Sequence, residues 1–476
     1  MKNNKNSKAR FIHISNTKRK NFSLYLKWLG LALLIFFIFE MFYRRVQKNH
    51  ATPPFPIDLV YTWVDGRDSR WVSLFQQTAK RHKIEYGRGT FEKRFVDLQE
   101  LRFSLRSVEK FASFINKIYI VTMNQVPSWI NRNRTFIPFT ILNDKDLNST
   151  DGFQESGNGN RMNQIFIEML HQQYQERNAN KIKKIYDQFR KKMEKPKTNF
   201  PEIIFVSHND IFPNDALPTF NSKAIDFSIS NIPNLSEHFI YMNDDMFFGQ
   251  KVGYNFFFQK DGKPKWLYGI RNFTDFRNEY NKIMTSNERY DNGAKMYTAS
   301  YLGTILKFEK KFGRFSIFDR PHVAFPLTKS ICKEVSEAFA KDIHETIFSK
   351  FRQASNLQMQ TLMFQYGIHT HQAVLVDDDP NKSDFFIANI PSSLKKMGIR
   401  LYSKMPIVFC INIERDQYRG KIVAFLDRLF PRPSFYEHEN VDRIEIDFKD
   451  YYFWKRRKNF FPNSEHCHIY NLLFNY

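Results

Sequence analysis

HFIYMNDDMFFG, residues 238–249, is the stretch that decides the fold of this 476-residue chain. Residues 239–242 are apolar and aromatic, which predicts a short buried strand. Asp244 and Asp245 follow at its end, and adjacent carboxylates beside a core are costly because they repel each other and lose water. A divalent cation compensates both effects, so we predict that these two aspartates bind one. An acidic surface turn is the alternative.

Strand-like and helical runs alternate outward from this stretch. Strands are predicted at residues 58–63, 117–122 and 203–206, and residues 95–111 have helical periodicity. Such alternation predicts an α/β fold, a Rossmann-like sheet with flanking helices. Because such sheets bind ligands outside the carboxyl ends of their strands, the polar clusters after the predicted strands are the candidate site.

Composition narrows the class of protein. The net charge of +23, with 72 Lys and Arg against 49 Asp and Glu, suits a polyanionic partner. The chain is also rich in Lys, Asn and Phe, so much of this charge is expected on solvated faces, and without a zinc-finger or RNA-binding signature we expect no nucleic-acid partner. Three cysteines, Cys332, Cys410 and Cys467, exclude a disulfide-dense scaffold, and none has structural-zinc spacing.

The N-terminal residues predict a membrane anchor. Residues 1–23 carry seven Lys or Arg and form a basic cytoplasmic tail, and the apolar residues 24–43 suit one spanning helix. The predicted protein is therefore single-pass type II, in the Golgi or endoplasmic reticulum membrane, with a lumenal body. The further divisions are a stem at 44–56, a catalytic domain at 57–440 and an aromatic, basic extension at 441–476. Glycosylation sequons on the body begin at Asn133, Asn148, Asn234, Asn272 and Asn381.

Two clusters near the predicted strand ends suit a phosphorylated ligand. Asp65 ends the first strand and loop before Gly66, and Trp63 offers a face on which a base or sugar can stack. A plain Asp-Gly turn is the alternative. Arg102 and Arg106 share one face of the predicted helix and suit a diphosphate, unless they lie on a solvated face.

Two further residues suit catalysis. His322 follows Arg320 and Pro321 among apolar residues, so it is a candidate general base. Arg352 is a candidate for stabilising developing phosphate charge. A structural histidine and an ordinary ion-pair partner are the alternatives. Asn243 lies directly before the acid pair and is assigned to the donor site.

Four ordered blocks of this chain resemble the Stealth family. Residues 57–71 (IDLVYTWVDGRDSRW) are similar to its first conserved region, and the segments from DLQELRFSLRSVEKF to the acid pair resemble the second. PHVAFPLTKS with KFRQAS resembles the third, and INIERD with LDRLFPRPSFYE the fourth. The resemblance runs from about residue 57 to 437. Ile413, where the family often has an acid after the Asn, departs from the fourth region.

The resemblance implies a nucleotide-sugar transferase-like sheet and transfer of a sugar-1-phosphate. Asp244 and Asp245 would bind Mg²⁺ or Mn²⁺, and Asp65 would lie in the donor site. His322 and Arg352 match the histidine and arginine of the third region. The expected reaction moves a hexose-1-phosphate, with N-acetylglucosamine-1-phosphate as one candidate, from a UDP-sugar to a hydroxyl of a glycan or glycoprotein, releasing UMP. The alternatives are a metal-dependent glycosyltransferase releasing UDP and a catalytically silent, membrane-anchored glycan binder.

Overall fold

The computed structural model describes residues 37, 52–84, 95, 97–138, 141, 200–270, 276–285, 293–313, 318–388, 390–413 and 418–438. The predicted basic tail, nearly all of the predicted spanning segment, most of the stem and the extension at 441–476 lie outside these residues. Within the described part of the chain, no helix has the length and apolar character needed to cross a membrane. The elements below belong to the unit that begins at Pro53.

A six-stranded sheet carries the fold. Its strands run in the order β3-β4-β2-β1-β5-β9, all parallel except β9, which pairs antiparallel with β5. The strands are β1 (Ile57–Thr62), β2 (Lys117–Thr122), β3 (Thr135–Phe136), β4 (Glu202–Ser207), β5 (His238–Asn243) and β9 (Phe325–Thr328). The predicted α/β fold with a parallel-rich sheet is therefore confirmed, and each predicted strand lies within about a residue of its observed bounds.

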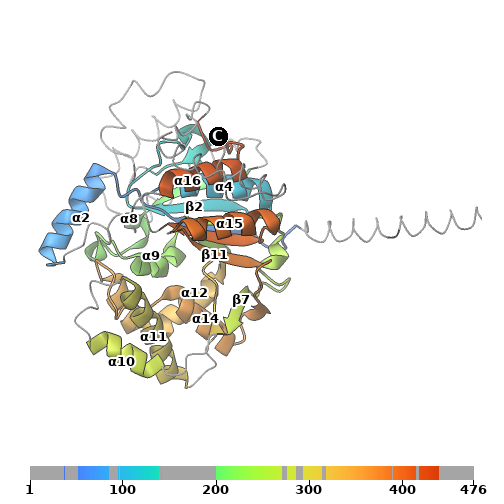
Figure 1. The fold of residues 1–476 in the computed structure, drawn as a ribbon. Helices are drawn as coiled ribbons and strands as arrows, with labels where there is room; N and C mark the ends of the chain where they lie inside the picture. Colours follow the sequence, from blue (N-terminus) through green and yellow to red (C-terminus); the bar gives the residue numbers. More distant parts are fainter. Residues whose placement is uncertain are drawn as a thin grey trace, which may run out of the picture. The chain divides into compact units, whose positions relative to one another are not determined.

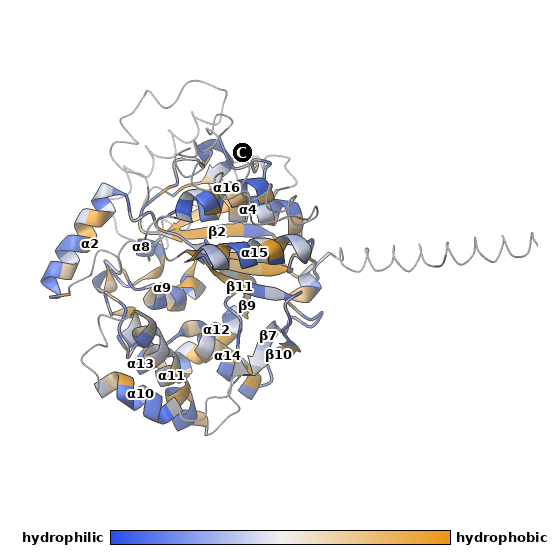
Figure 2. Cartoon of the chain, viewed as in Figure 1, coloured by the Kyte–Doolittle hydropathy of each residue, from blue (hydrophilic) through white to orange (hydrophobic). Residues whose placement is uncertain are grey.

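Both faces of this sheet are covered, which is why its strands are continuously apolar. Leu59 and Tyr61 of β1 point to the face that packs against α4, while Val60 points to the opposite face, against α9, α12 and α14. Figure 1 shows α4 and α16 on one side of β2, with α9, α12 and α14 on the other. In Figure 2 the strands are hydrophobic in colour, and the surrounding helices have polar outer faces.

Eleven helices are described in this unit, and several pack pairwise, α10 against α11 and α12 against α14 among them. Their bounds are α2 (Ser69–Arg81), α4 (Glu100–Phe111), α8 (His208–Ile211), α9 (Ser222–Ser228), α10 (Phe276–Thr285), α11 (Gly293–Phe312), α12 (Lys329–Ala338), α13 (Ala340–Ile347), α14 (Met359–His369), α15 (Pro391–Ser403) and α16 (Arg419–Leu429).

Two small sheets complete the described structure. One has the order β11-β12-β6, from β11 (Ser383–Ala388), β12 (Val408–Ile413) and β6 (Met246–Phe248). The other has the order β10-β7-β8, from β10 (Val374–Asp377), β7 (Lys265–Ile270) and β8 (Phe318–Asp319). Because β5 lies in the main sheet and β6 in a small one, Asp244 and Asp245 form the corner at which the chain passes between sheets.

The helix predicted at 95–111 begins later than expected, at Glu100. Gln99, the residue before it, has φ of 65°, a left-handed conformation that breaks the helical path. Asp97 and Leu98, which precede this break, therefore do not continue the axis of α4.

Candidate active site

The site lies where the direction of the sheet connections reverses. From β1 the chain adds β2 and β4 on one side, then returns to place β5 on the other side of β1. In such a sheet a crevice forms at the carboxyl ends of the strands flanking the reversal. A cavity of about 390 Å³ opens there, lined by Thr62 and Trp63 after β1 and by Asn243, Asp244 and Asp245 after β5.

Three carboxylates meet beside this cavity. One oxygen each of Asp97, Glu100 and Asp244 lies within 4.8 Å of the others. The left-handed turn at Gln99 brings the first two together: Gln99 N donates to Asp97 Oδ1 at 3.0 Å, and Leu98 N donates to Glu100 Oε2 at 2.6 Å. We call Asp97, Glu100 and Asp244 the carboxylate cluster.

The electrostatics of the carboxylate cluster favour a bound cation. Burial, opposed by hydrogen bonds and reinforced by neighbouring carboxylates, raises the pKa of Asp97 to about 6. Burial and then neighbouring acids also raise the pKa values of Glu100 and Asp244 well above their usual range. An all-oxygen donor set with such repulsion fits a hard dication such as Mg²⁺ or Mn²⁺. Glu100 and Asp244 line the large cavity, so an ion held here faces it.

Asp245 belongs to a second group. Its carboxylate, a ring nitrogen of His322 and Cys410 Sγ lie within 4.8 Å of one another. The Cys410 thiol donates a hydrogen bond to Asp245, whose backbone oxygen accepts from Ile411 N at 3.0 Å. The expectation that Asp244 and Asp245 act as one ligand pair is therefore revised, because their side chains join different groups.

His322 lies at the cavity in a form suited to accepting a proton. Burial, and then the positive charges of Arg320 and Arg352, lower the pKa of His322 to about 4. The ring is therefore neutral at pH 7. Asn243 Nδ2 lies 3.4 Å from His322 Nε2, and Phe385 packs edge-on at 5.5 Å between ring centroids. His322, Arg352 and Asn243, predicted separately from sequence, thus line one cavity.

A polar chain forms another part of the cavity wall. Tyr241 Oη donates to Asp226 Oδ1 at 2.6 Å and lies 3.1 Å from Thr62 Oγ1. Burial raises the pKa of Asp226 to about 6, against the hydrogen bond from Tyr241 and the charges of Arg352, Arg320 and Lys223. The cavity therefore carries cationic side chains as well as the carboxylate cluster, which suits a phosphorylated ligand.

Arg102 and Arg106 lie outside both cavities, so we do not assign them the donor-binding role that the sequence predicted. Their side chains are only 5% and 3% exposed and share Glu437, which is fully buried. Arg102 Nε lies 2.5 Å from Glu437 Oε2, and Arg106 Nε and Nη2 lie 2.6 and 2.7 Å from its two oxygens. Neither arginine lines the large cavity or its neighbour, because both guanidinium groups are committed to this carboxylate.

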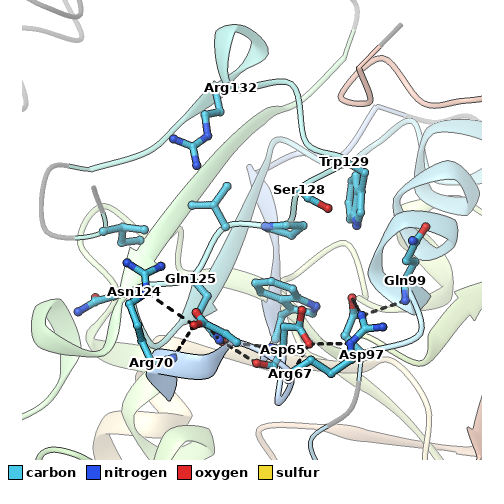
Figure 3. Close-up of a pocket in the computed structure, with 15 residues that line it drawn as sticks. Asp65, Arg67, Arg70, Asp97, Gln99, Asn124, Gln125, Ser128, Trp129 and Arg132 are labelled. Atoms are coloured by element: carbon cyan, nitrogen blue, oxygen red, sulfur yellow. Dashed lines mark hydrogen bonds and ion pairs between the residues drawn. The ribbon is translucent and has the colours of Figure 1, made fainter. Parts of the chain in front are cut away.

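Asp65 lies in a neighbouring cavity of about 210 Å³, shown in Figure 3. Its Oδ1 accepts from Arg67 N at 3.0 Å and Nε at 3.1 Å. Gln125 accepts from Asp65 N and donates to Asp65 O, so β1 and β2 jointly fix the turn. Gly66 is needed here, since a Cβ would lie 2.4 Å from Phe95 O.

Trp63 connects the two cavities because its side chain lines both. Trp129 and Arg132 also line the smaller cavity, and Figure 3 shows both on the side away from Asp65. The aromatic faces and the cation suit a nucleoside and its phosphate. Asp97 lines the smaller cavity as well and belongs to the carboxylate cluster, so the cluster separates the two spaces.

Sequence reasoning missed Asp97, Glu100, Asp226 and Cys410. Asp97 and Glu100 occupy polar positions of an amphipathic helical pattern. That pattern does not predict the left-handed turn at Gln99. Asp226 lies in a helix and Cys410 in an apolar strand, so each looks like an ordinary surface or core residue. The spacing of Asp97 and Glu100, two acids three residues apart, was the only feature of the sequence that could have indicated a ligand pair.

Comparison with known families agrees with this geometry. Models of three Stealth protein conserved regions match the chain: region 1 at residues 55–78, region 2 at 94–170 and 175–266, and region 3 at 321–369. Together they cover about half of the sequence. The chain belongs to the Stealth family. Asp65 falls in region 1, the carboxylate cluster and Asp245 in region 2, and His322 and Arg352 in region 3.

Named relatives are polysaccharide phosphotransferases. The capsular polysaccharide phosphotransferase SacB of Neisseria meningitidis serogroup A is 26% identical over 393 residues, 80% of this chain and 57% of the relative. The capsular polysaccharide phosphotransferase fcs1 of Haemophilus influenzae is 25% identical over 379 residues, 78% of this chain and 81% of the relative. The exopolysaccharide phosphotransferase SCO2594 of Streptomyces coelicolor is 25% identical over 394 residues, 80% of this chain and 52% of the relative.

This chain thus spans a little over half the length of SacB. Among solved structures, mouse xyloside xylosyltransferase 1 is 8% identical with a TM-score of 0.29, covering 75% of this chain and 98% of that one. A TM-score this low supports no argument about function.

Proposed function

We propose that this chain transfers a sugar-1-phosphate, such as N-acetylglucosamine-1-phosphate, from a UDP-sugar to a hydroxyl group of a glycan or glycoprotein, releasing UMP. One observation carries the proposal: Glu100 and Asp244 of the carboxylate cluster and the neutral ring of His322 line the same cavity at the reversal point of the sheet. The names of the relatives, which are polysaccharide phosphotransferases, support sugar-phosphate transfer as the reaction class.

The residues divide the reaction between them. Asp97, Glu100 and Asp244 would hold Mg²⁺ or Mn²⁺, which neutralises charge on the diphosphate. His322 accepts the proton of the acceptor hydroxyl, whose oxygen attacks the sugar-proximal phosphorus. The bond to the UMP oxygen breaks, and the sugar C1–O bond survives. Arg352 and Arg320 stabilise charge on the transferred phosphoryl group.

The donor is proposed to occupy both cavities. Its nucleoside lies in the smaller one, near Trp63, Trp129 and Asp65, and its diphosphate reaches the carboxylate cluster that separates the spaces. The acceptor then enters the large cavity past Phe385, the residue packed against His322. Stacking of the base on a tryptophan face supplies donor affinity.

A product analysis tests the reaction class. The full chain is incubated with a panel of UDP-sugars, Mg²⁺ or Mn²⁺ and glycan acceptors, and the products are followed by ³¹P NMR. The proposed reaction gives a sugar–phosphate–sugar diester and UMP. Release of UDP with a glycoside product identifies the alternative glycosyltransferase. Glycan binding without turnover, unchanged in the double substitution Asp244→Ala and Asp245→Ala, identifies the silent binder.

The proposed location is the Golgi or endoplasmic reticulum membrane, with the body in the lumen. Three predicted glycosylation sequons within the described residues start at exposed asparagines, Asn133, Asn234 and Asn381, as lumenal modification requires. Expression in a eukaryotic cell followed by N-glycosidase treatment tests this orientation. A mobility shift supports a lumenal body, and full sensitivity of the body to protease in sealed microsomes contradicts it.

A further inference from the structure

Asp245, His322 and Cys410 form a second group of potential metal ligands beside the carboxylate cluster. We call these three residues the mixed cluster. A carboxylate oxygen, a ring nitrogen and a sulfur atom lie within 4.8 Å of one another. They come from three separate parts of the chain: the corner after β5, the segment before β9, and strand β12.

The mixed cluster is fixed by the surrounding structure. Cys410 is paired in register with Met246, the residue after Asp245, and Ile411 N holds the backbone oxygen of Asp245 at 3.0 Å. Both interactions place the thiol beside the carboxylate. Asp245 Oδ1 is buried and accepts no hydrogen bond from any described residue. A buried carboxylate oxygen without a partner is costly, and a cation would satisfy it.

The donor types of the two clusters differ. Three carboxylates select hard ions that prefer oxygen, such as Mg²⁺. Sulfur and imidazole nitrogen with one carboxylate favour transition-metal ions such as Zn²⁺, which binds Cys, His and Asp at about 2.0–2.3 Å. Tetrahedral ligands at those lengths are roughly 3.3–3.8 Å apart. Contraction of the mixed cluster by roughly an ångström and a half at most produces that arrangement and leaves one position open.

We propose that Asp245, His322 and Cys410 bind Zn²⁺ or a similar transition-metal ion, separately from the Mg²⁺ or Mn²⁺ at the carboxylate cluster. Cys410 would bind as the thiolate, losing its proton to solvent, and His322 as the neutral ring. This binding does not depend on the proposed transferase reaction.

Some charged groups around the mixed cluster disfavour a bound cation, and others favour it. Arg320 and Arg352 lie close enough to His322 to disfavour added positive charge. Asp244 and Glu100 act on Cys410 with the opposite sign, as does Asp245 itself. Asp244 and Glu100 also belong to the carboxylate cluster, so their effect on the mixed cluster depends on whether an ion is bound there.

One consequence rests on the proposed function. An ion at the mixed cluster occupies His322, the residue proposed to accept the acceptor proton, so Zn²⁺ should inhibit the transferase. Added Mg²⁺ should not relieve this inhibition, because Mg²⁺ binds thiolate and imidazole poorly. Inhibition at the carboxylate cluster would instead be relieved by Mg²⁺, so a Mg²⁺ titration separates the two sites.

The binding test uses Co²⁺ as a spectroscopic substitute for Zn²⁺. The full chain, with Cys467→Ser as background because that residue lies outside the described structure, is titrated with Co²⁺ in excess Mg²⁺. We expect a near-ultraviolet charge-transfer band typical of thiolate-bound cobalt, lost on addition of one equivalent of Zn²⁺. Cys410→Ser should abolish the band. The matched control Cys332→Ser, at a buried cysteine of α12, should keep it.

Two further measurements keep the test decisive. His322→Gln should weaken Zn²⁺ binding by calorimetry at least tenfold, and circular dichroism checks that each variant is folded. If the band persists in folded Cys410→Ser, or if folded wild type gives no band, the proposal is overturned. Turnover of a UDP-sugar in Mg²⁺ alone is scored separately, so its absence counts against the transferase proposal and leaves the metal result standing.

Discussion

The carboxylates of Asp244 and Asp245 are consecutive in the chain yet join different groups of side chains. Asp244 lies with Asp97 and Glu100, whereas Asp245 lies with His322 and Cys410. The two aspartates form the corner between β5 and β6, where the chain leaves the main sheet. Substitution of Asp244 and substitution of Asp245 should therefore have different effects on the protein.

Asp244→Asn should remove metal-dependent activity. The substitution takes one of three charged ligands from the carboxylate cluster, and we expect kcat/KM to fall by about 10²-fold or more. Activity measured across a Mg²⁺ titration checks this. Asp261→Asn, at an exposed turn, is the matched control and should behave like wild type. Full activity of Asp244→Asn at ordinary Mg²⁺ concentrations would contradict the metal assignment.

Asp97→Asn should change how stability depends on pH in the ion-free protein. The pKa of Asp97 is raised from 3.8 to about 6 in the folded state, so this acid lowers stability as pH rises between those values. The substitution should therefore raise the free energy of unfolding more at pH 7 than at pH 4, by on the order of 2 kcal/mol.

Urea unfolding of wild type and Asp97→Asn, both in EDTA at pH 4 and pH 7, measures that difference. The comparison between proteins is necessary because His322 acts in the opposite direction: its lowered pKa costs stability as pH falls from 6.5 to about 4. Saturating Mg²⁺ should stabilise wild type at pH 7 more than at pH 4. An equal stability difference at both pH values would argue against a raised Asp97 pKa.

His322→Gln should lower kcat with little change in donor affinity. Loss of a general base typically costs about 10²–10⁴-fold. Because the pKa of His322 is about 4, the wild-type enzyme should show no loss of activity between pH 8 and pH 6 from protonation of this ring. Steady-state kinetics over that range check both statements. His344→Gln, exposed on α13, is the control. A wild-type acid limb centred at about pH 6.5 that is lost in His322→Gln would contradict the lowered pKa of His322, and an unchanged kcat in His322→Gln would exclude this residue as the base.

Glu437→Gln should destabilise the fold and leave the cavity chemistry in place. Glu437 is fully buried between Arg102 and Arg106, so neutralising it leaves Arg102 without its counter-charge and Arg106 with only the partly exposed Asp427. Removing one partner of a buried ion pair costs about 3–5 kcal/mol. Asp427→Asn, which removes a partly exposed contact of Arg106, should cost less than about 1 kcal/mol. Urea unfolding compares the two variants, and equal losses would contradict this account.

Hydrophobic pattern located the four central strands of the main sheet, β4, β2, β1 and β5, because they are buried on both faces and read as continuous apolar runs. It did not predict the short edge strands β3 and β9. It also located the strand ends, and with them Trp63, Asp65, Asn243, Asp244 and Asp245. His322 and Arg352 were chosen by residue type and flanking sequence, and the resemblance to the third conserved region supported both.

The remainder of the site depends on tertiary contacts that local pattern does not encode. Arg102 and Arg106 looked like a phosphate-binding pair because their buried partner, Glu437, is more than three hundred residues away in the chain. Asp97 and Glu100 reach the cavity only because Gln99 adopts a left-handed conformation. The sequence around Cys410 predicts a core residue, and only the pairing of β12 with β6 brings its thiol to Asp245.

The corner at Asp244 and Asp245 joins two sheets that both contribute to the site. The six-stranded sheet ends at Asp244, and the chain enters the sheet formed by β6, β12 and β11 after Asp245. Phe385, whose ring packs edge-on against His322, belongs to β11 of that same small sheet. Phe385 is also paired in register with Cys410, so the ring that packs on His322 and the thiol beside Asp245 are held by the same two strands.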